Sequence, residues 1–111
     1  GSNVAVVGPG ESFEVSIDYA IRDCDCSGCR EQIEIGLSME TVHQYCAYDA
    51  VPGCSADRSS HSGTITAPSV PGEYDLRFNR RQDYGCFNSS DTWWGAVPSA
   101  DRTFARICVV E

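Results

Sequence analysis

The sequence predicts an all-β protein, an antiparallel β-sandwich braced by disulfides. Apolar residues alternate with polar ones along several segments, and turn residues separate these segments. Alternation with a period of two is typical of a strand that has one face in the core and one in water. The chain also holds seven cysteines among 111 residues, a density typical of small cross-linked extracellular domains.

The predicted strands follow one another with turn signals between them. Strands are expected at residues 4–7, 13–21, 31–39, 63–67, 73–78 and 102–110. Gly-Pro-Gly at 8–10 and Val-Pro-Gly at 70–72 are expected to be tight turns. Longer connections remain at 22–30, 40–61 and 80–101, and each of them carries cysteines. Because loops longer than about 12–15 residues are usually functional or disordered, functional residues are expected in these connections.

Residues 8–15 form a turn that leads into an early strand, and residues 69–76 place Tyr74 at the start of a later strand. These two stretches resemble extracellular immunoglobulin-like and fibronectin-III-like domains. The resemblance implies an immunoglobulin-like antiparallel β-sandwich of about seven strands with long, disulfide-pinned loops. It also implies a tyrosine corner, in which the Tyr74 hydroxyl binds a backbone group a few residues upstream. The resemblance concerns fold and not activity.

Size and charge narrow the classes of partner. Gly1-Ser2 is typical of the scar left by tag cleavage, and residues 3–111 are expected to form a single domain. The net charge of −8 disfavours binding to nucleic acid and to anionic membrane surfaces. No apolar run approaches the roughly 18 residues of a membrane span, so membrane insertion is not expected.

The cysteines are expected to form disulfides in a secreted or cell-surface protein. Cys46 and Cys54 flank one loop, and a bond between Cys86 and Cys108 would tie the 80–101 connection to the last strand. The expected arrangement is therefore Cys26–Cys29, Cys46–Cys54 and Cys86–Cys108, with Cys24 free or bonded to another chain.

The 80–101 connection is the candidate ligand site, because it holds both tryptophans of the chain. Adjacent residues of an extended backbone point to opposite sides, so at most one of the two tryptophans can join the core. An exposed Trp beside Tyr, Asp and Arg suits stacking on a sugar, and the same residue types are enriched in protein hot spots. In an alternative reading the tryptophans cap the sandwich and Arg81 pairs with Asp83 or Asp91. The candidate ligand-binding residues are Arg81, Asp83, Tyr84, Asp91, Trp93 and Trp94.

Metal sites and catalysis have weaker sequence support. Cys24, Cys26 and Cys29 with His43 would suit zinc, but disulfide bonding is the favoured use of these cysteines. Asp23 and Asp25 are candidate calcium ligands, with Asp83, Asp91 and Asp101 in another segment, although no twelve-residue calcium loop is present. His43 and His61 are the only histidines, and no Gly-x-Ser-x-Gly motif occurs. No catalytic residue, no enzyme activity and no cofactor other than the calcium alternative are expected.

These observations favour a secreted, non-catalytic binding module that recognises a glycan, or else a protein ligand, through the 80–101 connection. One alternative is a structural or adhesion module of a larger cell-surface protein, in which the aromatic residues pack internally or against neighbouring domains. A second alternative is a metal- or thiol-dependent module built on Cys24, Cys26 and Cys29.

Overall fold

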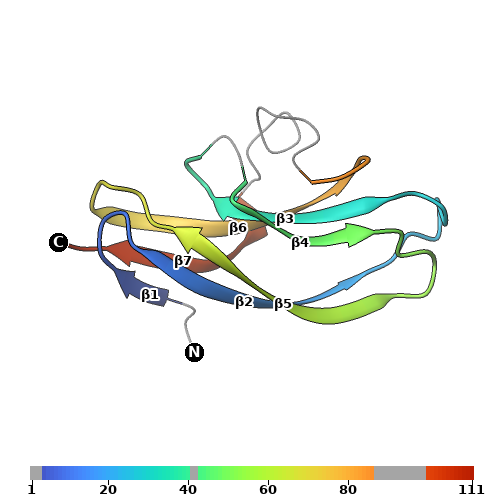
Figure 1. The fold of residues 1–111 in the computed structure, drawn as a ribbon, viewed down its shortest axis with the longest axis horizontal. Coiled ribbons are helices and arrows are strands. Elements are labelled where there is room, and N and C mark those ends of the chain that lie inside the picture. The colour runs from blue at the N-terminus through green and yellow to red at the C-terminus, as the bar shows by residue number, and fades with distance from the viewer. Residues whose placement is uncertain (1–3, 41–42, 87–99) are drawn as a thin grey trace.

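The computed structural model describes residues 4–40, 43–86 and 100–111, and almost all of their regular structure is β-strand (Figure 1). The all-β prediction is confirmed. The elements are β1 (Val4–Val7), β2 (Ser12–Ile21), β3 (Glu31–Leu37), β4 (Tyr45–Ala50), β5 (Asp57–Thr66), β6 (Gly72–Gln82), the short 3₁₀ helix η2 (Ala100–Arg102) and β7 (Thr103–Val109). Among these described elements, no helix has the length and apolar character that a membrane span requires.

The strands form two sheets. The larger sheet has five strands in the order β1-β7-β6-β3-β4, and the smaller one pairs β2 with β5. In Figure 1, β2 and β5 run side by side along one face of the molecule, with β3 and β4 along the opposite face. The layout therefore has two unequal layers, a curled mixed sheet and a two-stranded sheet.

The core lies between the two layers. Alternate residues of β3, namely Ile33, Ile35 and Leu37, are all buried, as the period-two pattern predicts. They join inward-facing residues of β5, β6 and β7. The remaining buried apolar residues of this cluster are Val7, Ile21, Ala47, Tyr48, Ile65, Ala67, Leu76, Ile107 and Val109.

One pair of strands departs from the antiparallel prediction. Val4 to Val7 of β1 run parallel to Arg106 to Val109 of β7. Parallel neighbours need a long crossover between them. Here nearly the whole domain forms that crossover, because β1 and β7 are the first and last strands.

The 40–61 segment was expected to be a long loop, and this expectation is wrong. It contains β4 and the first half of β5. The polar run from Arg58 to Ser60 forms part of β5 because it pairs with β2, where Asp18 lies opposite Ser60 and Ala20 opposite Arg58. This half of β5 is exposed on both faces, from Asp57 to Ser60, so its sequence has no apolar alternation and carries no strand signal.

The structure has three disulfides, of which the sequence predicted one. Cys26–Cys29 is confirmed. The expected Cys46–Cys54 pair is wrong, and so is the expectation that Cys24 is free or bonded to another chain, because Cys24 is bonded to Cys54. These two cysteines lie on connections that meet in space, since the Asp23 N–H donates a hydrogen bond of 2.7 Å to the carbonyl oxygen of Gly53.

The expected Cys86–Cys108 pair is also wrong, because Cys46 is bonded to Cys86 and Cys108 is the free cysteine. Cys108 lies opposite Glu73 near the start of β6, whereas Cys86 follows the end of that strand. The two ends of β6 are about 30 Å apart at the rise of an extended chain, so Cys86 and Cys108 cannot meet. Three disulfides are typical of an oxidising, extracellular environment.

The predicted contact of Tyr74 is present. Its hydroxyl donates a hydrogen bond of 2.6 Å to the carbonyl oxygen of Val70, four residues upstream. This bond fixes the turn before β6 against the first residues of the strand.

Candidate functional site

The described part of the candidate site begins where β6 ends. Arg81, on β6, and Asp83, just after it, form an ion pair in which Nη2 lies 2.5 Å from Oδ2. Their side chains are only 11% and 16% exposed. The Asp83 carboxylate also accepts a hydrogen bond of 2.7 Å from the Tyr84 N–H. These contacts therefore hold both charged side chains within the turn and stabilise it.

The turn is also held from the neighbouring strand β3. The Gln32 side-chain amide donates to the Asp83 carbonyl oxygen at 2.6 Å and to Asp49 Oδ1 at 3.0 Å. Asp49, on β4, is paired with Arg30 at 2.8 Å. Burial opposes ionisation of Asp49, but the hydrogen bonds from Arg30 and Gln32 outweigh it and lower the pKa of this carboxyl. The turn therefore rests on a hydrogen-bonded base that spans β3, β4 and β6.

A covalent bond completes the base. The Cys46–Cys86 disulfide joins β4 to the segment after β6 across the intervening strand β3, with Cα atoms 6.0 Å apart. Tyr84 lies between Asp83 and Cys86, and its side chain is 88% exposed. A large, mostly exposed ring on a braced backbone can contact a ligand with little loss of backbone freedom.

The structure brings three of the predicted ligand residues together. Arg81, Asp83 and Tyr84 lie on one turn, and of these Tyr84 is open to solvent. The predicted alternative use of Arg81, pairing with Asp83, is confirmed. The other three candidates, Asp91, Trp93 and Trp94, lie outside the described residues.

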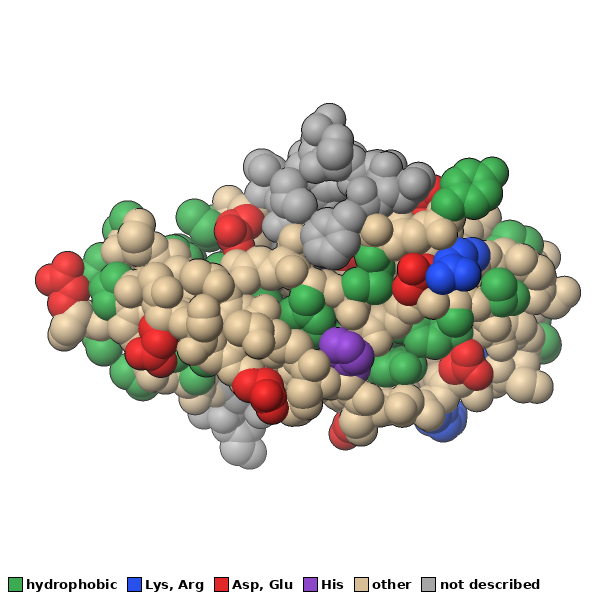
Figure 2. Space-filling view, in the orientation of Figure 1, with side chains coloured by type: hydrophobic (Ala, Val, Ile, Leu, Met, Phe, Trp, Pro, Cys, Tyr) green, Lys and Arg blue, Asp and Glu red, His purple; other side chains and the backbone are tan. Residues whose placement is uncertain are grey.

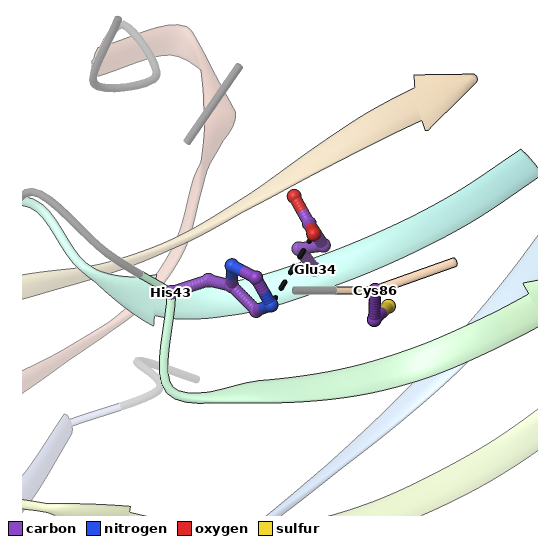
Figure 3. A group of neighbouring side chains, drawn as sticks. All are labelled: Glu34, His43 and Cys86. Atoms are coloured by element: carbon purple, nitrogen blue, oxygen red, sulfur yellow. Dashed lines mark ion pairs between the residues drawn. The ribbon is translucent and has the colours of Figure 1, made fainter. Parts of the chain in front are cut away.

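Beside this turn, a histidine and a glutamate are buried against each other. His43 Nε2 lies 3.2 Å from Glu34 Oε2, and the two residues are 4% and 0% exposed. Figure 3 shows the His43 ring directed at the Glu34 carboxylate on β3, with Cys86 close by. Burial, together with the positive charge of Arg81, lowers the pKa of His43 to about 4. The imidazole is therefore neutral at pH 7.

Glu34, His43 and Cys86 could hold a metal ion by position, since one ligand atom of each lies within 4.8 Å of the others. Metal ions bind the thiolate form of cysteine, and the Cys86 sulfur is bonded to Cys46. The oxidised protein thus offers one imidazole and one carboxylate at this place. The zinc alternative built on Cys24, Cys26 and Cys29 meets the same obstacle, since all three sulfurs are in disulfides.

One carboxylate of the calcium alternative, that of Asp23, accepts hydrogen bonds from its own loop. Asp23 Oδ1 accepts hydrogen bonds from the N–H groups of Asp25 and Cys26 at 3.0 and 2.9 Å. A side-chain hydrogen bond with Glu31 lowers the pKa of Asp23, whereas burial raises the pKa of Glu31. These contacts shape the start of the β2–β3 connection.

Sequence reasoning missed the buried polar row on β3. Glu34 is a polar residue of the alternating strand predicted at 31–39, and such a residue ordinarily faces solvent, yet it is fully buried. Gln32 is fully buried as well. The alternation reports which residues share a face, but it does not report whether a second layer covers that face. The sequence offered no direct signal of this burial, because Cys46 and Cys86, which flank β3 in the folded sheet, both follow it in the chain.

Acidic side chains are spread over the surface drawn in Figure 2, as the net charge of −8 requires. The chain matches no family model, no curated protein and no solved structure.

Proposed function

We propose that the protein is an extracellular, non-catalytic binding module whose ligand contacts the face around Tyr84. The favoured ligand is a neutral glycan. The observation that carries the proposal is the largely exposed Tyr84 ring on a turn fixed by the Arg81–Asp83 ion pair and by the Cys46–Cys86 disulfide. The proposed extracellular location rests on the three disulfides.

The chemistry of this face favours an uncharged ligand with an apolar side. An aromatic ring stacks on the C–H face of a pyranose, and neighbouring polar groups supply hydrogen bonds. The net charge of −8 repels sulfated and sialylated glycans. The sequence places Asp91, Trp93 and Trp94 in the same connection, and they are proposed as further ligand contacts.

A second candidate function is a structural or adhesion module of a larger surface protein. The ion pair between Arg81 and Asp83 favours this second candidate, because side chains that bind each other stabilise the turn rather than contact a ligand. In this case Tyr84 contacts a neighbouring protein domain. An immunoglobulin-like relationship is part of either proposal, supported by the Tyr74–Val70 hydrogen bond and by the two-layer arrangement.

The two candidates are separated by screening the folded, oxidised protein on an array of neutral and acidic glycans. The proposal expects binding to a neutral glycan, a loss of at least about tenfold in affinity for Tyr84→Ala, and retention for Tyr84→Phe. Val70→Ala is the matched control, because Val70 is an exposed apolar residue near the opposite end of β6.

A glycan that binds the wild type and Tyr84→Ala equally would contradict the proposed face. Absence of binding to every glycan would leave the adhesion module as the better account. In that case, Tyr84→Ala would be expected to weaken contact with a neighbouring domain.

A further inference from the structure

Among the described residues, β2 pairs with β5 alone, so the other edge of β2 has no strand partner. β2 is ten residues long. An exposed strand edge of this length is a template for pairing with another extended segment.

The hydrogen bonds of Thr66 show which backbone groups of β2 face the open edge. The Thr66 N–H donates to Gln44 Oε1 at 2.7 Å, and the Gln44 amide donates back to the Thr66 carbonyl oxygen at 3.0 Å. Thr66 therefore directs its backbone groups away from β2, so its pair with Ser12 is a non-hydrogen-bonded pair.

Because such pairs alternate along an antiparallel ladder, every second residue of β2 from Ser12 onward turns its N–H and C=O toward the open edge. The residues that follow Ser12 in this set are Glu14, Ser16, Asp18 and Ala20.

An apolar groove runs along the same edge. One cavity of about 460 Å³ lies between β2 and the strands β6 and β7, lined by Ile17, Tyr19, Phe78 and Phe104 among others. A second cavity of about 380 Å³ lies further along β2, toward β1. The two cavities share Ser16 and Phe104, so they adjoin.

Along the groove, the apolar core is not fully covered. The inward residues of β2 from Phe13 to Tyr19 are only partly buried, although they pack against the core cluster. Across the groove, Phe78 is 37% exposed and its ring centroid lies 6.4 Å from that of Phe104. Large apolar rings that stay partly open beside an unpaired strand edge mark a site for another chain.

We propose that this groove, bounded by β2 on one side and by Phe78 and Phe104 on the other, binds an extended peptide segment of a partner protein by β-strand addition. The bound segment pairs its main chain with the open edge of β2 and places alternate apolar side chains over the aromatic rings. This site is separate from the Tyr84 face and does not depend on the proposed glycan function.

Charge selects the residues between the apolar ones. Glu14 and Asp18 are exposed on the outer face of β2, next to the open edge. On the other side of the groove, Arg106 of β7 is paired with Asp75, and Arg80 of β6 is paired with Glu31. Basic or hydroxyl-bearing residues are therefore preferred at the outward positions of the segment, in keeping with the net charge of −8.

A second copy of this chain fits the groove less well. The β2 strand of another copy already uses its inward face against its own core, through residues from Phe13 to Tyr19. A strand has two faces only, so the same side chains cannot also fill the groove. A peptide segment has its inward face available.

The first test uses wild-type protein and a labelled nine-residue peptide that alternates valine with lysine or threonine. Fluorescence anisotropy is expected to show saturable binding, at least about tenfold tighter than that of a peptide of the same composition with its valines consecutive. Replacing the lysines of the alternating peptide by glutamate is expected to weaken its binding to the groove. Equal binding of the alternating and the consecutive peptides would overturn the proposal.

Backbone methylation of the peptide tests main-chain pairing without changing the protein. Only one of the two alternating sets of peptide N–H groups can face β2. N-methylation of one set is therefore expected to abolish binding, and N-methylation of the other set to be tolerated. If both methylated peptides bind like the parent, strand addition is excluded.

Two variants of the protein form a matched pair. Ser16→Pro and Ser62→Pro each remove the 2.7 Å hydroxyl hydrogen bond between these residues, and each places proline on an outer strand. Only Ser16→Pro removes an N–H from the groove edge, so it alone is expected to lose peptide binding. Equal loss in both folded variants would contradict the assignment. A dimer of the wild type that Ser16→Pro dissociates would also overturn it, in favour of a second copy.

Discussion

His43 Nε2 lies 3.2 Å from Glu34 Oε2 in the interior of the protein, beside the Cys46–Cys86 disulfide. The pair lies close to Cys86, two residues after Tyr84. Because burial and the charge of Arg81 keep the imidazole neutral, the contact joins the Glu34 carboxyl group to an uncharged ring. Protonation of His43 would place a buried cation near Arg81, so the stability of this face depends on pH.

The first prediction is that acid destabilises the protein through His43. Its pKa is about 4 when folded, against an ordinary value of 6.5. The unfolded chain therefore binds the proton first, and stability falls as the pH drops from 6.5 toward 4. Between about pH 7 and about pH 4.5, this group lowers the free energy of unfolding by about 2 kcal/mol.

Urea unfolding of wild type and His43→Gln at both pH values measures this effect. The variant is expected to lose less stability on acidification, since glutamine does not titrate in this range. Carboxyl groups that do not contact residue 43 contribute equally to both proteins and cancel in the comparison. Parallel pH profiles for the two proteins would show that His43 is not the titrating group.

Gly63 is predicted to be intolerant of a side chain. A Cβ atom at this position would lie 2.5 Å from Cδ2 of the Tyr45 ring, which in turn stacks on His61 at 5.5 Å between centroids. Gly63→Ala is therefore expected to lower the free energy of unfolding by about 1–3 kcal/mol. Gly28→Ala is the control, because a Cβ there meets nothing within 4 Å. If both variants showed the same melting temperature in thermal denaturation, the close packing of Gly63 against Tyr45 would be contradicted.

Tyr74→Phe is predicted to weaken the fold modestly. The substitution removes the 2.6 Å hydrogen bond to the Val70 carbonyl oxygen and keeps the ring. A loss of about 1 kcal/mol in the free energy of unfolding is expected, the usual net contribution of one such bond. An unchanged midpoint in chemical denaturation would show that this bond does not stabilise the turn before β6.

The Cys46–Cys86 bond is predicted to be a large source of stability. It closes a loop with a sequence separation of 40 residues. In the chain-entropy model, such a closure stabilises the folded state by about 4 kcal/mol. The double variant Cys46→Ala, Cys86→Ala is expected to lose this amount in denaturant unfolding. Removing Cys26–Cys29, with a separation of 3 residues, is expected to cost clearly less.

The sequence predicted the fold where one face of a strand is apolar. β1 was predicted with its observed bounds, and the alternation of Ile33, Ile35 and Leu37 identified their side of β3 as the core face. It did not predict β4 or the first half of β5. The first half of β5 is polar on both faces and exposed from Asp57 to Ser60, so it pairs with β2 but buries little.

The candidate site was predictable only in part. The sequence drew attention to Arg81, Asp83 and Tyr84, but their exposures differ because two of them pair with each other. Glu34 is buried beside His43 and Cys86, which lie outside its strand, and local sequence does not report this. The disulfide pairs failed for the same reason, since Cys24 and Cys54 meet across two connections 30 residues apart.

Covalent bonds brace the two-layer fold and fix the turn that presents Tyr84. Non-reducing peptide mapping by mass spectrometry, after alkylation of free thiols in denaturant, tests this bracing most directly. The account predicts three linked peptide pairs, Cys24–Cys54, Cys26–Cys29 and Cys46–Cys86, with the alkyl label on Cys108 alone. A Cys86–Cys108 link, or label on Cys46 and Cys86, would contradict it.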